Sequence, residues 1–339
     1  MTREVLCHIG LPKSGSTVLQ NTWSAATNYA INSPLNLIQI IQRAVLEESV
    51  CERALMKIIS EHAIRKSDLD GKSNQYVVIS SESFTQPPIA GSQRRSRIEK
   101  LFLNCVASLV EGCTDKVLLI VRNPLTWIKS YYYQQIKQGR SYSFPEYLVE
   151  ERRAIVANLD LGAILTAFQS RMPDVVLLPI ELLQANEERF WQEYEERLKF
   201  PRPNINSLPS DTISANKTRE ETISLHRTLN QCFEMLENAV AALEMTDKES
   251  VLNALSIAKT WGTRRALGFM NESDLRRLQS LMNQPGQLPA PQCFSLEKEL
   301  IADLTESFLA SLEKPGVFPY PEYLEEYRAS LKSGAIQIF

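Results

Sequence analysis

The sequence predicts an α/β fold followed by a helical C-terminal extension. Two observations predict it. Four short apolar runs have the length and the β-branched content of buried strands; they cover residues 5–9, 76–79, 117–121 and 175–180. The stretches between these runs carry apolar residues at spacings of three and four, the period of an amphipathic helix. Strands that alternate with helices are typical of an α/β domain.

The bulk composition is that of an ordinary folded domain and argues against several functions. Of the 339 residues, 44% are hydrophobic and 23% are charged, as in globular proteins generally. The formal net charge of −3 provides no general attraction to nucleic acid, so no nucleic-acid partner is expected. No apolar run approaches the roughly 20 residues that span a bilayer, and the N-terminus lacks the pattern of a signal peptide.

The cysteines and histidines do not form a metal-binding pattern. Six cysteines and three histidines are scattered along the chain, and no C-x-x-C is present. Zinc sites need ligands at close, regular spacings, so no metal is expected. Free thiols in a reducing compartment are the simplest account of the cysteines, and the expected location is the cytoplasm.

The first strand leads into a glycine-bearing loop at residues 10–15, Gly-Leu-Pro-Lys-Ser-Gly, and Ser16 and Thr17 then open a helix. A strand, a glycine loop and a helix N-terminus in this order form a cradle for an anion, because backbone N–H groups point into the loop and the helix dipole adds positive charge. The nucleotide-binding pattern G-x-x-x-x-G-K-[ST] is nearly matched. Ser16 occupies its lysine position, however, and the lysine of the loop is Lys13.

Two further strands end in polar residues. The second strand is followed by Ser-Ser-Glu, which ends at Glu82, and the third by Arg122-Asn123-Pro124 and a helix that contains Ser130. If the strands are parallel, their carboxyl ends lie at one edge of the sheet with the loop. Glu82 would there be a general base toward a hydroxyl or, alternatively, a structural carboxylate at a helix start. Arg122 and Ser130 could converge on one phosphate.

Two of these motifs together resemble a known family. GLPKSGST at residues 10–17 resembles the 5′-phosphosulfate-binding loop of sulfotransferases that use 3′-phosphoadenosine 5′-phosphosulfate (PAPS). RNPLTWIKSYY at residues 122–132 resembles the 3′-phosphate motif of the same family, R-[DN]-P-x-x-x-x-x-S-x-Y. The resemblance covers residues 5–198. It implies a P-loop-like core in which helices flank a central parallel sheet, and transfer of a sulfuryl group without a metal.

The resemblance also implies a role for each motif residue. Lys13 would stabilise the leaving oxygen as the sulfur–oxygen bond breaks, and Glu82 would take the proton of the acceptor. The expected donor-binding residues are Pro12, Lys13, Ser14, Gly15, Ser16 and Thr17 in the loop, Arg122 and Ser130 at the 3′-phosphate, and Lys217 and Arg219 in a segment that closes over the nucleotide. The last two are equally well explained as the basic start of a helix.

The chain is expected to divide into a sulfotransferase-like core at 1–214 and a helical region at 215–339. Helices are predicted at 248–259, 272–282, 296–312 and 321–332 from their apolar spacing. Three roles are open for this region: a cover over the acceptor cleft, the surface of a homodimer, or a surface for another partner.

The aromatic residues Trp127 and Tyr131 to Tyr133 are either core residues or contacts to adenine or the acceptor.

The expected acceptor is a hydroxyl of a carbohydrate, on a cell-surface polysaccharide or a glycolipid, because Glu82 resembles the base of several carbohydrate and bacterial sulfotransferases. A small alcohol, a phenol and a lipid are alternatives. A kinase or NTPase of the P-loop type is a competing interpretation, but it requires a lysine at position 16 and an aspartate after a strand. A catalytically silent nucleotide-binding scaffold is another, which donor binding without turnover would reveal.

Overall fold

The computed structural model describes residues 4–46, 55, 57, 59–61, 63–65, 75–88, 95–204, 223–242, 248–259 and 292–338. The chain divides into two compact units. Unit 1 consists of Met1–Trp127, Arg153–Ala215 and Glu297–Gly334, and unit 2 consists of Ile128–Arg152, Asn216–Leu296 and Ala335–Phe339. The boundary expected between residues 214 and 215, like the helix expected at 272–282, lies outside the described residues.

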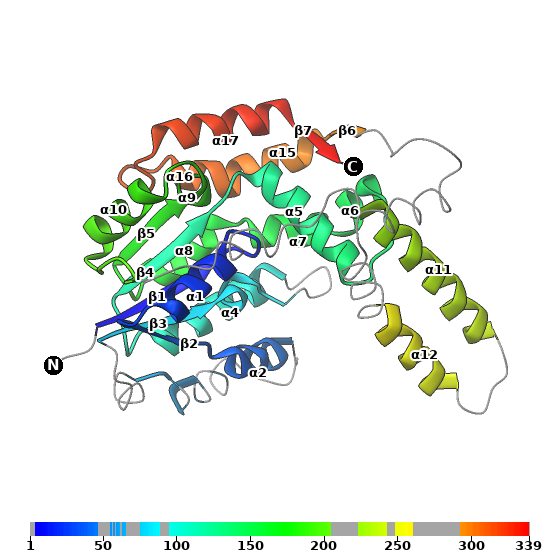
Figure 1. The fold of residues 1–339 in the computed structure, drawn as a ribbon, viewed down its shortest axis with the longest axis horizontal. Helices are drawn as coiled ribbons and strands as arrows, with labels where there is room; N and C mark the ends of the chain where they lie inside the picture. The colour runs from blue at the N-terminus through cyan, green and yellow to red at the C-terminus, as the bar shows by residue number, and fades with distance from the viewer. Residues whose placement is uncertain are drawn as a thin grey trace. The chain divides into compact units, whose positions relative to one another are not determined.

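A five-stranded parallel sheet forms the centre of unit 1 (Figure 1). Its strands are β1 (Glu4–Gly10), β2 (Tyr29–Asn32), β3 (Tyr76–Ser81), β4 (Lys116–Val121) and β5 (Asp174–Pro179). They lie in the order β2-β3-β1-β4-β5, and every neighbouring pair is parallel. The register places Ile9 beside Ser81 and Gly10 beside Ile120, so the carboxyl ends of β1, β3 and β4 meet at one edge. The predicted α/β fold with a central parallel sheet is confirmed.

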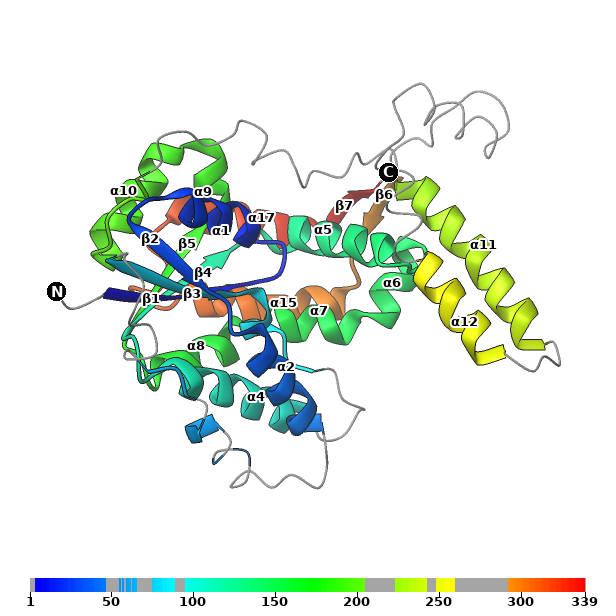
Figure 2. The same ribbon diagram turned by 60° about the horizontal axis from the view of Figure 1, so that its bottom comes forward.

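Helices cover both faces of this sheet (Figure 2). One face carries α1 (Ser16–Ala25) and α10 (Glu187–Leu198); the other carries α4 (Arg95–Val110) and α8 (Leu161–Gln169), and α2 (Leu35–Leu46) packs on α4. In β4, all residues after Lys116 are buried. A strand that is buried on both faces reads as a continuous apolar run, which explains why residues 117–121 were recognisable from sequence.

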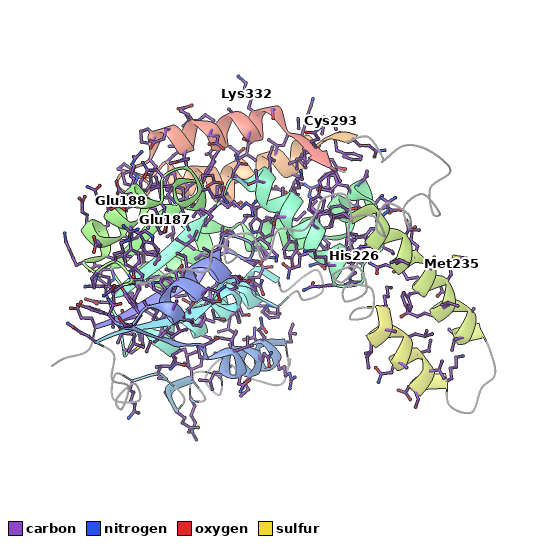
Figure 3. The ribbon with its side chains drawn as sticks, viewed as in Figure 1. Glu187, Glu188, His226, Met235, Cys293 and Lys332 are labelled. Atoms are coloured by element: carbon purple, nitrogen blue, oxygen red, sulfur yellow. The ribbon has the colours of Figure 1, made fainter. Side chains whose placement is uncertain are left out.

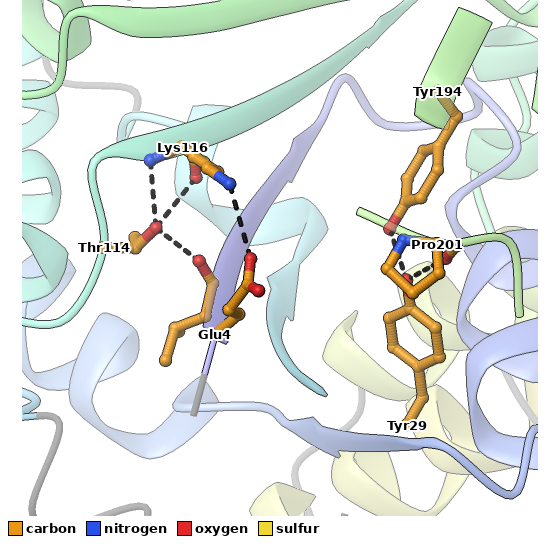
Figure 4. Close-up of polar contacts among 7 residues, drawn as sticks. Glu4, Tyr29, Thr114, Lys116, Tyr194 and Pro201 are labelled. Carbon is orange, nitrogen blue, oxygen red and sulfur yellow. Dashed lines mark hydrogen bonds and ion pairs between the residues drawn. The ribbon is translucent and has the colours of Figure 1, made fainter. Parts of the chain in front are cut away.

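Polar contacts align the strands near the amino ends of β1 and β4 (Figure 4). Thr114 Oγ1 donates to the carbonyl of Val5 at 2.6 Å, and Lys116 Nζ lies 3.5 Å from a carboxylate oxygen of Glu4. On one face, the Tyr29 hydroxyl donates to the carbonyl of Pro201 at 2.5 Å. The last contact ties the segment after α10 to β2.

Unit 1 also contains C-terminal helices. α15 (Lys298–Leu304) continues through a π-helical turn (Thr305–Leu309) into α16 (Ala310–Leu312), and this continuous stretch packs against α8; α17 (Pro321–Ser333) packs on α15 and on the π-helical turn. Glu187 and Glu188, labelled in Figure 3, form the first turn of α10, where acidic side chains complement the helix dipole. The helices expected at 296–312 and 321–332 are therefore present, and they belong to the same unit as the sheet.

Unit 2 is mostly helical. It contains α6 (Phe144–Glu150), α11 (Ile223–Ala242), α12 (Lys248–Ile257) and a two-stranded antiparallel sheet of β6 (Gln292–Ser295) and β7 (Ala335–Ile338); α5 (Pro124–Lys137) and α7 (Arg152–Asn158) cross its boundaries. Ser143 and Glu146 form a capping box at the start of α6, as their spacing favours. Met235, on α11, is 72% exposed (Figure 3). In the described part of the chain, no helix has the length and apolar character needed to cross a bilayer.

Candidate active site at the carboxyl edge of the sheet

The loop between β1 and α1 has a backbone that depends on its two glycines. Gly15 has a φ of 82°, which glycine adopts readily, and a Cβ there would lie 2.3 Å from Ile180 Cδ1. A Cβ on Gly10 would lie 2.2 Å from the hydroxyl oxygen of Ser16. Lys13 also has a positive φ, 64°. The loop is therefore a tight turn in which the start of α1 approaches the end of β1 closely.

The N-terminus of α1 lies at the end of this loop without a side-chain cap. The helix begins at Ser16, has no side-chain cap and carries no acidic residue in its first turn. Its positive dipole end and first N–H groups are thus not neutralised by side chains of that turn. Ser14 is fully buried, and its hydroxyl has no hydrogen-bond partner among the described residues. Such an arrangement suits a phosphate or sulfate group.

Side chains that follow β4 donate hydrogen bonds to two backbone carbonyls of the loop. Arg122 Nη1 donates to the carbonyl of Lys13 at 2.7 Å, and the indole N–H of Trp127 donates to the carbonyl of Pro12. Trp127 is fully buried, so of the two interpretations of this residue the structure supports the core one. The loop and the start of α5 therefore form one hydrogen-bonded assembly.

Glu82 lies directly after β3, at the start of the 3-10 turn η2 (Glu82–Thr85). Thr85 Oγ1 donates to the carbonyl of Gly10 at 2.9 Å, which ties this turn to the loop. Burial raises the pKa of the Glu82 carboxyl, while the charge of Lys13 and the hydroxyl of Ser16 lower it. Among the described residues, the Ser16 hydroxyl makes no hydrogen bond of ordinary geometry, to Glu82 or to any other group. A buried carboxylate with a raised pKa is suited to general-base catalysis near neutral pH.

Arg122 lies at the edge of the loop, and among the described residues its guanidinium donates two hydrogen bonds. Nε donates to Thr126 Oγ1 at 3.0 Å, and Nη1 is occupied by the carbonyl of Lys13. Burial lowers the pKa of Arg122, and the nearby Glu181 and Tyr327 raise it; a guanidinium stays charged in either case. The rest of the fork can bind an anion.

Glu181 and α17 brace this edge of the sheet. Glu181 Oε1 accepts from the backbone N–H of Asn123 at 2.9 Å, and Oε2 accepts from the hydroxyl of Tyr327 at 2.6 Å. Asn123 Nδ2 also donates to Ser330 Oγ at 2.8 Å. Sequence reasoning missed Tyr327 and Ser330, because nothing in an amphipathic helix shows which distant strand end it will meet.

The structure thus brings the following residues predicted from sequence to one place in unit 1: Pro12, Lys13, Ser14, Gly15, Ser16, Thr17, Glu82 and Arg122. Ser130 lies on α5 in unit 2, and its convergence with Arg122 stays a prediction. Lys217 and Arg219 lie outside the described residues. Within the described ranges, no group of three or more histidine, cysteine or acidic residues has a metal-binding arrangement.

Solved structures that resemble this chain include two sulfotransferases. No family model and no curated protein matches this chain. A sulfotransferase from Alicyclobacillus acidocaldarius is 16% identical with a TM-score of 0.42, over 82% of this chain and 100% of that one. Mouse sulfotransferase SULT7A1, solved in complex with PAP, is 10% identical with a TM-score of 0.37, over 96% of this chain and 89% of that one. Since both TM-scores are below 0.5, we rest the proposal below on the residues of this chain.

Proposed function

We propose that this chain transfers a sulfuryl group from PAPS to a hydroxyl of an acceptor. The observation that supports it most is the meeting of three motif residues from three strand ends. The charge of Lys13 acts on the carboxyl of Glu82, and Arg122 donates to the carbonyl of Lys13. A cation, a candidate base and an anion-binding guanidinium are therefore neighbours at the loop that resembles the PAPS-binding loop.

The residues present fit the two anionic ends of such a donor. Residues 12–17 would bind the 5′ end, because the uncapped start of α1 and the buried hydroxyl of Ser14 are found there. Arg122 and Ser130 would bind the 3′-phosphate, and Lys217 and Arg219 would close over the nucleotide. When bound, the donor supplies an activated sulfuryl group.

The chain's own residues would contribute positioning and charge. Lys13 would stabilise the negative charge that develops on the oxygen that leaves sulfur. Glu82 would accept the proton of the attacking hydroxyl at a carboxylate oxygen. The raised pKa of Glu82 makes it a stronger base than an exposed glutamate, and the nearby charge of Lys13 keeps it ionised.

The acceptor that we propose is a carbohydrate hydroxyl, on a cell-surface polysaccharide or a glycolipid. A sugar hydroxyl is a weak acid, so its attack benefits from a base held beside the donor. A glutamate in this position also resembles the base of carbohydrate sulfotransferases. Competing acceptors, namely a phenol and a simple alcohol, belong in the same assay with radiolabelled PAPS, and faster transfer to the phenol than to any sugar would contradict this part of the proposal.

The donor site is tested by isothermal titration calorimetry with 3′-phosphoadenosine 5′-phosphate (PAP). We expect wild type and Arg122→Lys to bind, and Arg122→Ala to bind at least tenfold more weakly, a loss of about 1.4 kcal/mol. Arg189→Ala is the matched control, because Arg189 is a half-exposed arginine that pairs with Glu322 on the surface of unit 1. Binding of ATP in place of PAP by wild type would refute the sulfotransferase proposal and favour a kinase.

A further inference from the structure

A continuous chain of hydrogen bonds connects α17 to the backbone beside Arg122, and the transfer step proposed above does not use it. The hydroxyl of Tyr327 donates to Glu181 Oε2 at 2.6 Å. Glu181 Oε1 accepts from the backbone N–H of Asn123 at 2.9 Å. That N–H belongs to the peptide group that directly follows Arg122. The carboxylate of Glu181 therefore fixes the backbone from which the Arg122 side chain extends.

Asn123 is hydrogen-bonded at each of its polar groups. Its side-chain Nδ2 donates to Ser330 Oγ at 2.8 Å, and its Oδ1 accepts from the N–H of Leu125 at 3.0 Å. Its backbone N–H is held by Glu181, and its carbonyl accepts from Thr126 Oγ1 at 2.9 Å. Asn123 is also buried. A buried polar network in which every member is satisfied is rigid, so this residue has a fixed orientation.

The guanidinium end of Arg122 is held by the first turn of α5 and by the loop. Nε donates to Thr126 Oγ1 at 3.0 Å, and Nη1 donates to the carbonyl of Lys13 at 2.7 Å. All of these residues belong to unit 1. Hydrogen bonds thus order both the backbone and the side chain of Arg122. A side chain that is already ordered loses little rotamer freedom when a ligand binds to it.

The geometry and the charge of Glu181 have opposite effects on an anion at Arg122. The charge of Glu181 raises the pKa of Arg122, so the carboxylate lies close enough to repel a phosphate that approaches the guanidinium. The hydrogen bond to the Asn123 N–H instead favours binding, because it keeps Arg122 in one orientation. Removal of Glu181 therefore weakens phosphate binding if its geometry dominates and strengthens it if its charge dominates.

We propose that Glu181 is a positioning residue for Arg122. Its carboxylate is held by Tyr327 and orders the backbone beside Arg122, so that the guanidinium is in place before the 3′-phosphate of the donor binds. The C-terminal helix α17 thereby acts on donor recognition through Glu181. This inference rests on the proposed function, since that function assigns the 3′-phosphate to Arg122.

Calorimetry with PAP and with adenosine 5′-monophosphate (AMP) tests this proposal, because AMP has the 5′-phosphate but no 3′-phosphate. We expect Glu181→Ala to bind PAP about three- to tenfold more weakly, since Arg122 then loses rotamer freedom on binding, and to bind AMP as wild type does. Glu181→Gln keeps an acceptor for the Asn123 N–H and removes the charge, so it should bind PAP at least as tightly as wild type. In an Arg122→Ala background, Glu181→Ala should have no further effect.

Further variants distinguish positioning from a general structural effect. Glu188→Ala is the matched control, because Glu188 is an exposed glutamate that pairs with Arg202 on the surface of unit 1, and it should leave PAP binding unchanged. Circular dichroism shows whether Glu181→Ala folds. If it does not, Tyr327→Phe and Ser330→Ala carry the same measurement, since each removes one bond of the chain.

Three results would overturn the proposal: PAP binding by Glu181→Ala that is as tight as that of wild type or tighter, an equal loss for PAP and AMP, or a full loss in the Arg122→Ala background. Absence of PAP binding by wild type would refute the proposed function instead. Nitrogen-15 relaxation of the Arg122 Nε–H in the free protein then decides the role of Glu181. Lower order in Glu181→Ala than in wild type supports positioning, and equal order contradicts it.

Discussion

Replacing Tyr327 with phenylalanine removes one oxygen from the brace between α17 and the end of β5. The Tyr327 hydroxyl donates to Glu181 at 2.6 Å, and Tyr327 is fully buried. A hydrogen bond to a charged group contributes about 1.5–3 kcal/mol. The buried carboxylate of Glu181 keeps its hydrogen bond from the Asn123 N–H, so the variant removes one of two hydrogen bonds and does not leave the carboxylate without a partner. We expect the free energy of unfolding to fall by about 2 kcal/mol at pH 7.

This loss should depend on pH. Burial raises the pKa of Glu181 above the ordinary value of 4.5, and the bond from Tyr327 opposes that rise. In Tyr327→Phe the pKa of Glu181 therefore rises further. A carboxyl whose pKa is higher in the folded state than in the unfolded state loses stability as pH rises through the folded pKa. The penalty of the variant is thus smaller at pH 4.5, where more of Glu181 is protonated, and larger at pH 7 to 8.

Urea unfolding followed by tryptophan fluorescence measures this penalty, because Trp23, Trp127 and Trp191 are all buried in unit 1. The matched control is Tyr323→Phe, the same chemical change one turn away on α17, at a side chain that is partly exposed. Two results would contradict this argument. One is a loss in the free energy of unfolding for Tyr327→Phe that is no larger than the loss for Tyr323→Phe. The other is a loss for Tyr327→Phe that is as large at pH 4.5 as at pH 8.

Three further predictions concern the loop and the sheet. Gly15→Ala should abolish PAP binding in calorimetry and lower the melting temperature, because it adds a Cβ 2.3 Å from a side-chain carbon of Ile180 at a φ of 82°. Lys13→Met should raise the pKa of Glu82, since the charge of Lys13 lowers it; the acidic limb of the pH–rate profile of any residual activity should move to higher pH. Thr114→Val removes a buried hydrogen bond of 2.6 Å and should cost about 1–3 kcal/mol in urea unfolding.

Matched controls exist for two of these. Gly316 also has a positive φ, 77°, but nothing lies within 4 Å of its Cβ position, so Gly316→Ala should show only the backbone cost of about 1–2 kcal/mol. Thr166→Val removes an exposed bond within α8 and should cost less than the change at Thr114. Equal losses of stability in Gly15→Ala and Gly316→Ala would contradict the packing argument. Equal losses in Thr114→Val and Thr166→Val would contradict the argument from the buried hydrogen bond. A pKa of Glu82 that falls or stays constant in Lys13→Met would contradict the electrostatic one.

The strands that could be predicted from sequence are those whose own residues form a continuous apolar run. β1, β3, β4 and β5 are apolar because they are buried, and their carboxyl ends carry the motif residues Glu82 and Arg122. β2 (Tyr29–Asn32) and the pair β6 and β7 were not predicted. Each has four residues, and each is a strand only because a distant segment pairs with it, so local pattern carries almost no information about it.

The candidate site divides in the same way. The glycines and Lys13 were predictable because backbone sterics and charge restrict which residues can occupy a phosphate loop. The brace from Tyr327 to Glu181 was not, because 146 positions separate the two residues along the chain.

The position of α17 has a consequence for biosynthesis. The strands, the loop and Glu82 leave the ribosome well before residues 326–330, which supply the hydroxyls and the carboxylate that meet Asn123 and Glu181. A nascent chain can form most of its sheet from the N-terminus onward, yet the carboxyl of Glu181 then lacks its tyrosine and the segment around Arg122 is not fixed. Competence to bind the donor is therefore expected to arise late in translation, once the C-terminal helix has docked.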